Sequence, residues 1–252
     1  MLLSQYLAIT QSLIQTPQSP IPLLTPALLT TYINIARGQV AGQGECVLAQ
    51  GTMSIGPGTQ NPSLPFSFTL IEWLEPTLIA GAINIRMLTW ATDTGGAQRL
   101  YPREWPWFNT YVLSHPVPKT GPPKIWAQYR QGSLGTLYVN PLDGNYVLRV
   151  DAVCYPVDLV DDTTPDGIPY LWSDAVPFYA AYYAYMAMQR QADADHMLQR
   201  FQELMGRART AVTPAVQPGS YPQGPDPMMP NRLALQPAPQ RGRGMPAGAM
   251  AG

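Results

Sequence analysis

The spacing of apolar residues changes twice along this chain, from helical to strand-like and back to helical. Residues 3–14 and 26–43 carry apolar side chains at the intervals of amphipathic helices, and Thr25 supplies a capping oxygen to the second. Residues 46–155 lose this spacing, and residues 173–209 regain it. We therefore expect an α+β protein, in which a helical bundle with a long C-terminal helix carries a β-sheet insertion.

Residues 46–155 are expected to form an antiparallel sheet or small sandwich of about five to seven strands. The predicted strands are short runs rich in β-branched and aromatic residues, separated by Gly, Pro and Asn: FSFTLIEWL, PTLIAGAINIRMLTW, FNTYVL, KIWAQYR, GTLYV and YVLRVDAV. The clearest predicted pairing is a hairpin of residues 135–139 with residues 146–153. Asp143 and Gly144 lie in the loop between these runs, and this pair suits a tight turn.

Residues 173–209 predict one helix, which at about 1.5 Å per residue would be roughly 50 Å long. A helix of that length either packs partly on another subunit or has a kink near residues 191–195. Small residues on one face let a second helix approach closely, and tyrosines on all sides suit a helix between subunits or an ordinary half-buried helix. The predicted subunit interface is Val176, Tyr179, Ala180, Tyr183, Ala184 and Ala187.

The C-terminal residues 211–252 contain nine prolines and six glycines, and few large apolar side chains. Such a segment cannot bury enough surface to fold alone, so we expect an extended arm that lies along a partner. Residues 207–252 hold five Arg and one Asp, a net charge of +4, whereas residues 1–206 are at −5. Protein is the preferred partner over nucleic acid, because the arginines are sparse. The candidate binding residues of the arm are Tyr221, Arg232, Leu233, Leu235, Arg241 and Arg243.

The low charge of the chain indicates association. Charged residues are 12% of the chain and there are 28 prolines. A surface poor in charge has little to keep it from associating with other surfaces. The expected organisation is N-terminal helices in 1–45, a β-rich domain in 46–157, an acidic loop and long helix in 158–210, and the arm in 211–252.

The acidic loop that precedes the long helix contains Asp158, Asp161, Asp162 and Asp166. Several carboxylates at short spacing suit Ca²⁺ or Mg²⁺, and a metal-dependent hydrolase is one alternative function. The ligand order of a calcium loop and its closing Glu are missing, so a solvated connection is preferred. The loop equally offers negative charge to the arginines of another subunit.

The residues that enzymes use for catalysis are scarce. His115 precedes a proline, and His196 follows Asp193 by three positions, a spacing more typical of a surface pair than of a ligand set. Cys46 and Cys154 have no metal-binding or disulfide spacing and suit buried thiols. No nucleophile, phosphate-loop or dinucleotide motif is present. We expect no enzyme, cofactor or metal centre, and neither a secretory signal nor a membrane span.

Tryptophans offer a second alternative function, a tail-associated carbohydrate-binding module. Indole rings stack on sugars, and the candidate residues are Trp105, Trp107 and Trp126. A body made only of strands would favour this interpretation, and the predicted Ala- and Tyr-rich helix disfavours it.

The order of these parts resembles the head-to-tail adaptor, or connector, proteins of tailed bacteriophages, especially those with short tails. The resemblance covers roughly residues 25–210. It lies in the succession LLTTYINIARGQVAGQGECVL, PPKIWAQY, GTLYVNPLDGNYVLRVDAVCYPVDL and DDTTPDGIPYLWSDAVPFYAAYYAYMAMQRQADADHMLQRFQELMGRAR. The tail is longer and richer in Pro and Gly than is usual in the family.

The resemblance implies a virion protein at the head–tail junction, assembled in the host bacterial cytoplasm. Its copies would form a ring, commonly of twelve, beneath the portal protein, and the ring would meet a tail nozzle or tail-tube protein below. Double-stranded DNA would pass through the lumen without sequence readout. The C-terminal arm would reach along the portal.

Overall fold

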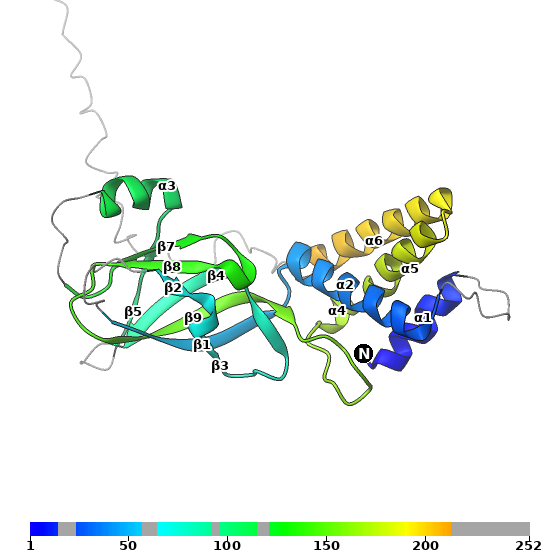
Figure 1. Ribbon diagram of the computed structural model, residues 1–252, viewed down its shortest axis with the longest axis horizontal. Coiled ribbons are helices and arrows are strands. Elements are labelled where there is room, and N and C mark those ends of the chain that lie inside the picture. Colours follow the sequence, from blue (N-terminus) through cyan, green and yellow to red (C-terminus); the bar gives the residue numbers. More distant parts are fainter. Residues whose placement is uncertain (15–23, 57–64, 92–95, 115–120, 213–252) are drawn as a thin grey trace, which may run out of the picture. The chain divides into compact units, whose positions relative to one another are not determined.

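The computed structural model describes residues 1–14, 24–56, 65–91, 96–114 and 121–212. Contacts divide the chain into a unit of residues 1–213 and a unit of residues 214–252, and the described residues belong to the first. Figure 1 shows helices and sheets in this first unit, so the chain is an α+β protein with antiparallel sheets and a long C-terminal helix, as predicted.

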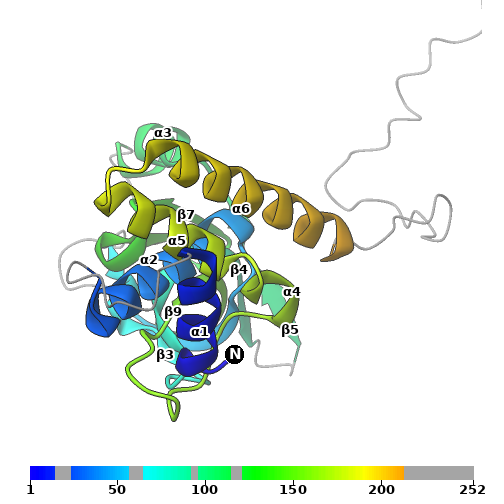
Figure 2. The same cartoon turned by 90° about the vertical axis from the view of Figure 1, so that its right-hand side faces the viewer.

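The helices come from both ends of the first unit and pack on one another (Figures 1 and 2). They are α1 (Leu3–Ile14), α2 (Pro26–Gly44), α4 (Tyr170–Ser173), α5 (Val176–Ala187) and α6 (Gln191–Val212). Both N-terminal helices lie where the apolar spacing predicts them. Thr25 caps α2 as expected, because its hydroxyl accepts a hydrogen bond from the Leu28 amide at 3.2 Å. The α5 helix packs against α1, α2 and α6, which places its small residues inside the bundle.

The strands form a five-stranded and a four-stranded sheet in the described part of the chain. The first has the order β3-β1-β9-β4-β5, from Glu72–Trp73, Leu48–Ile55, Tyr146–Pro156, Ile79–Ala91 and Ala97–Arg99. The second has the order β2-β8-β7-β6, from Phe66–Ser67, Thr136–Asn140, Ile125–Tyr129 and Tyr101–Pro102. All pairings are antiparallel except that of β6 with β7.

The predicted hairpin of residues 135–139 with residues 146–153 is wrong. β8 pairs with β2 and β7 in the smaller sheet, whereas β9 pairs with β1 and β4 in the larger one. The connecting loop crosses from one sheet to the other, and its Leu142 is buried between them in the core. The long β9 strand pairs along its length with β1 on one side and β4 on the other, which leaves no edge for β8.

Two of the segments predicted as single strands form other elements in the structure. FNTYVL belongs to the helix α3 (Trp105–Phe108) and the following π-helical turn η2 (Asn109–Leu113). Pro106 lies in the first helical turn, where its missing N–H is harmless, and the Phe108 ring is buried. FSFTLIEWL is divided into β2, the 3-10 turn η1 (Phe68–Leu70) and β3, because the Ser67 hydroxyl accepts a hydrogen bond from the Thr69 amide. A further 3-10 turn, η3 (Gly132–Leu134), precedes β8.

The run of residues 173–209 is not one continuous helix. α5 ends at Ala187, and α6 begins at Gln191 and packs against α5, so the run is interrupted at residues 188–190, just before the alternative kink near residues 191–195. Gln189 has a φ of 59°, and the amides of Gln189 and Arg190 donate to the carbonyls of Met186 and Tyr185. This left-handed cap turns the chain back on itself. The length of the run therefore gives no support to a contact with another subunit.

Candidate functional site

The acidic loop is joined to the helical bundle by a buried ion pair. The Asp166 carboxylate lies 3.0 Å from the Arg37 guanidinium on α2, and their side chains are 3% and 1% exposed. The Tyr6 hydroxyl on α1 donates to the same carboxylate at 2.7 Å, and so does the Ile168 amide at 3.1 Å. The Met1 ammonium lies 3.1 Å from the same carboxylate, so the buried charge of Asp166 is compensated by two cations and by hydrogen bonds.

The pKa of Asp166 reflects these contacts. Burial favours the neutral acid, but the hydrogen bonds from Tyr6 and Ile168 and the charge of Arg37 outweigh it and hold the pKa below its usual range. Burial and the Asp166 charge raise the pKa of Tyr6, which stays a neutral donor. Asp166 is therefore a structural anion at neutral pH.

Further hydrogen bonds fix the loop on both sides of this pair. The Asn34 side chain donates to the Leu159 carbonyl at 3.0 Å and accepts from the Leu159 amide at 2.9 Å. Arg37 donates to the Val157 carbonyl at 2.8 Å, and Asp162 accepts from the Ser4 amide at 2.8 Å. The loop that follows β9 is thus held to α1 and α2.

The four predicted carboxylates of the loop have different surroundings. Asp161 accepts hydrogen bonds from Thr163 and Thr164, whose donors lower its pKa, and Asp158, Asp161 and Asp162 are exposed. Asp166 is buried and paired. Within the described ranges, no group of three or more His, Cys, Asp or Glu side chains is placed to hold a metal ion. Asp161, Asp162 and Asp166 make hydrogen bonds that hold the loop in place, and the four carboxylates do not converge on a common point.

The loop and the start of α4 expose apolar side chains to solvent. Val160 is 78% exposed, and it follows Leu159, whose backbone makes two hydrogen bonds to the Asn34 side chain. Tyr170 is 78% exposed and Leu171 is 50% exposed at the start of α4, just after the paired Asp166. Val160 lies near the start of the loop, and Tyr170 and Leu171 follow its end; we call these three exposed side chains together the loop patch. Because the loop is anchored on both sides, these side chains are held at the surface, where another protein can contact them.

The predicted interface residues of α5 lie on two sides of the helix. Val176, Ala180 and Ala184 are fully buried by the chain's own helices, so they have no surface to offer another subunit. The half-buried members are Tyr179, Tyr183 and Ala187. The Tyr183 ring stacks on Tyr32 of α2 with centroids 5.7 Å apart, and the Tyr179 ring contacts Phe201 of α6 at 4.6 Å. This tyrosine face remains available for a contact.

The tryptophans do not form one platform for a sugar. Trp126 is buried, and Trp105 packs between Tyr129 and Tyr138, with centroids 4.6 Å from each. Trp107 alone of the three is exposed, and the Arg103 guanidinium lies 5.0 Å from its ring centre.

The other predicted residues add no catalytic group. His196 is exposed on α6, and Asp193 pairs with Arg190 at 2.7 Å. Burial raises the pKa of both the Cys46 and Cys154 thiols to about 12, which keeps them unreactive. His115 and the six candidate arm residues lie outside the described residues. These are Tyr221, Arg232, Leu233, Leu235, Arg241 and Arg243.

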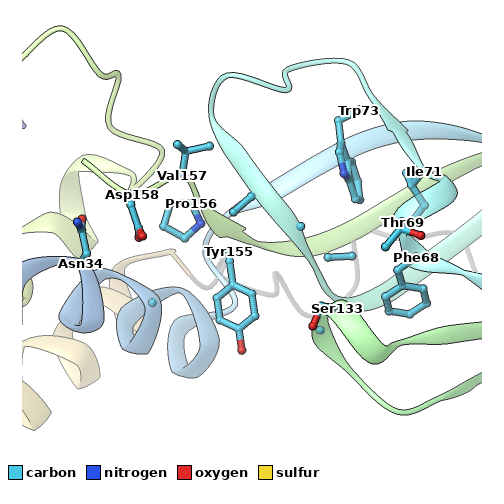
Figure 3. Close-up of a pocket in the computed structure, with 15 residues that line it drawn as sticks. Asn34, Phe68, Thr69, Ile71, Trp73, Ser133, Tyr155, Pro156, Val157 and Asp158 are labelled. Atoms are coloured by element: carbon cyan, nitrogen blue, oxygen red, sulfur yellow. The ribbon is translucent and has the colours of Figure 1, made fainter. Parts of the chain in front are cut away.

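A groove of about 880 Å³ lies between α2 and the strands (Figure 3). Asn34 and Gly38 line it from α2, and the aromatic rings of Phe68, Trp73 and Tyr155 line it from the β elements. Its remaining lining comes from residues 80–82 of β4, residues 132–133 of η3, Thr69, Ile71 and residues 156–158. Figure 3 shows Tyr155 between α2 and the side formed by Ser133 and Phe68. The groove is open, mainly apolar, and acidic at Asp158.

Three groups of this site were missed from the sequence: Tyr6, Asn34 and Arg37. The signal for Arg37 is a lone cation within the apolar stripe of the second helix, between Ile33 and Val40. A cation on the buried side of a helix requires an acidic partner, and Asp166 is that partner. The groove has no sequence motif.

Comparison with known protein families gives a match over most of the chain. A family model described as SU10 adaptor protein matches residues 4–222 of the chain. No curated protein matches it. In the part of the chain that the structure describes, no helix combines the length and apolar character needed to cross a bilayer.

Proposed function

The chain belongs to the SU10 adaptor protein family, phage head-to-tail adaptors of the short-tailed type, and from this premise we propose that its copies form a ring beneath the portal. The family is a structural one and not an enzyme class, and its members belong to the virion. The ring would be dodecameric, join the capsid to a tail nozzle or tail-tube protein, and assemble in the host cytoplasm.

The observation that carries the proposal is the loop patch on its rigid support. A mobile loop can fold its apolar side chains away, but the buried Arg37–Asp166 pair and the Asn34–Leu159 hydrogen bonds prevent this here. Val160, Tyr170 and Leu171 therefore stay in water in a single copy. In a ring, a neighbouring copy would cover them, and this burial stabilises the assembly.

The charge of the chain suits a channel for DNA. Residues 1–206 have a net charge of −5, so a ring of this part offers phosphates little attraction. DNA would then pass through the lumen without being held and without sequence readout. The basic C-terminal residues would instead bind the portal, and the candidate contacts are Tyr221, Arg232, Leu233, Leu235, Arg241 and Arg243.

The test is the mass of the full chain, alone and with its cognate portal protein, by mass photometry and negative-stain microscopy. Wild type should form rings on the portal. The double variant Val160→Asp with Tyr170→Asp should stay folded but lose the ring, because two carboxylates then lie in the covered surface. The control double variant Gln199→Asp with Gln202→Asp, at two exposed positions of α6, adds the same two charges elsewhere and should assemble normally. Rings formed equally by both variants would exclude the loop patch from the subunit contact.

A further inference from the structure

Part of the strand β4 has a free edge, and residues 80–82 in this part of the strand line the groove. β9 pairs with β4 from Ile79 to Trp90 on one side, but β5 on the other side pairs only with residues 89–91. The Leu88 carbonyl accepts from Leu100, and the Ile85 amide donates to the Gln128 side chain at 3.0 Å. Among the described residues, no strand pairs with residues 79–84 on this side.

Two glycines leave room beside this edge. Gly81 lies on the edge and Gly38 lies on α2, and both line the groove. A Cβ atom at either position would meet no atom within 4 Å. Glycine inside a helix is less favourable than alanine, and glycine inside a strand often marks the close approach of another backbone. The edge also has a bulge between Ile79 and Gly81, where pairing with β9 is irregular.

A free strand edge in a groove specifies the chemistry of its ligand. Its unpaired N–H and C=O groups match the backbone of an extended polypeptide, which would add as a further strand. Alternate side chains of that strand would meet the apolar lining at Phe68, Trp73 and Tyr155. The exposed Asp158 at the rim favours a basic residue in the incoming segment.

The chain itself contains a segment with this chemistry. Residues 231–236, NRLALQ, are six residues without proline, between Pro230 and Pro237. Leu233 and Leu235 alternate with smaller or polar residues, which is the period of a strand with one apolar face. Arg232 supplies the basic side chain. Prolines interrupt residues 214–230 at least every fourth position, and the other six-residue stretches, 240–245 and 247–252, are rich in glycine.

We propose that residues 231–236 of a second copy add as a strand to the free edge of β4, in the groove beside α2. The inference rests on the assembly of copies proposed above, and it assigns Arg232, Leu233 and Leu235 to a neighbouring copy in place of the portal, which leaves Tyr221, Arg241 and Arg243 as the portal contacts. A strand exchanged in this way links one copy to the next without enlarging the contact between their folded parts.

The first experiment measures binding of a fluorescein-labelled peptide of residues 228–239 by fluorescence anisotropy. The receptor is the full chain with Leu233→Asp and Leu235→Asp, so that its own segment does not compete. Binding should saturate, and it should weaken at least tenfold with Gly81→Trp, which fills the groove. Gly206→Trp on α6 is the matched control, because a Cβ there also meets no atom within 4 Å.

Circular dichroism establishes that each variant is folded. If Gly81→Trp is not folded, Gly38→Gln closes the groove from α2 and suits a helix better than glycine does. A peptide with both leucines changed to Asp should bind at least tenfold more weakly. No saturable binding, or equal binding to the Gly81→Trp and Gly206→Trp chains, would overturn the proposal.

The second experiment asks which copy supplies the segment. One tagged full chain carries Ala80→Cys and a differently tagged full chain carries Ala234→Cys, and the two are mixed under mild oxidation. The proposal predicts a disulfide-linked pair with both tags. A chain with both substitutions that cross-links only to itself would contradict it. Rings that form on the portal while the peptide fails to bind would refute the strand exchange and leave the adaptor function intact.

Discussion

Arg37 and Asp166 are 129 residues apart in the sequence, and their side chains meet at 3.0 Å in the interior. Arg37 belongs to α2 of the helical bundle, and Asp166 to the loop that leads from β9 to α4. Arg37 also bonds the carbonyl of Val157, directly after β9. The pair therefore joins the helical and β parts of the chain and supports the loop patch.

Loss of either partner should be strongly destabilising. Arg37→Met leaves the buried Asp166 carboxylate with the more exposed Met1 ammonium as its remaining cation, and we expect the free energy of unfolding to fall by about 3 kcal/mol. Urea denaturation measures this change. Adding Asp166→Asn to Arg37→Met should recover part of the loss, because the buried charge is then gone. Arg200→Ala, in the exposed pair with Glu203, is the control and should leave the midpoint almost unchanged.

Acid should remove the contribution of Asp166. Its pKa is lower in the folded chain than in the unfolded one, so the stabilisation is complete above about pH 4 and is lost as the pH falls through the folded value. Urea midpoints of wild type and Asp166→Asn should therefore differ at about pH 6, and the difference should shrink as the pH is lowered from about 4 to about 2.5. A constant difference over this range would show that the ionised carboxylate is not what stabilises the fold.

Ala184 tests the position of α5. Ala184 is fully buried, and Ala184→Arg should lower the free energy of unfolding by more than about 3 kcal/mol, through overpacking and a buried unpaired charge. A weaker helical signal in circular dichroism would show this loss of stability. Met186→Arg on the same helix is 40% exposed and should change stability by about 0.5 kcal/mol at most. Equal, small effects of both would place Ala184 on the surface instead.

The turn between α5 and α6 offers a stabilising substitution. Gln189 has a φ of 59°, a conformation that glycine adopts without steric cost. Gln189→Gly should raise the free energy of unfolding by about 0.5–1 kcal/mol, and the branched Gln189→Val should lower it. Thermal melts of the three proteins rank them. A valine variant as stable as wild type would mean that α5 and α6 are joined differently.

Local patterns in the sequence predict most of the elements but few of their partners. Periodicity finds α1, α2 and the long runs of β4, β7, β8 and β9, because each depends on the side chains of a few neighbouring residues. The hairpin of β8 with β9 fails because strand pairing is decided by the whole sheet. β1 was missed because its buried positions include Ala49 and Gly51, which weaken the apolar alternation.

The site is harder to predict than the fold. The left-handed cap at Gln189 has no glycine or proline to mark it, so residues 173–209 resemble one helix. Arg37 and Asp166 are each ordinary in the sequence, and only the folded chain brings them together. The groove is open at Gly38 and Gly81 because these residues have no side chain, and two isolated glycines form no recognisable sequence pattern.

The proposed function depends most on the coverage of this subunit's exposed apolar surface by copies of itself at the portal. Cryo-electron microscopy of the full chain mixed with its cognate portal protein tests this directly. We predict a closed ring on the portal, with the loop patch of Val160, Tyr170 and Leu171 buried between adjacent copies. A single copy that remains monomeric with the portal present, or a ring that leaves these three side chains in solvent, would contradict it.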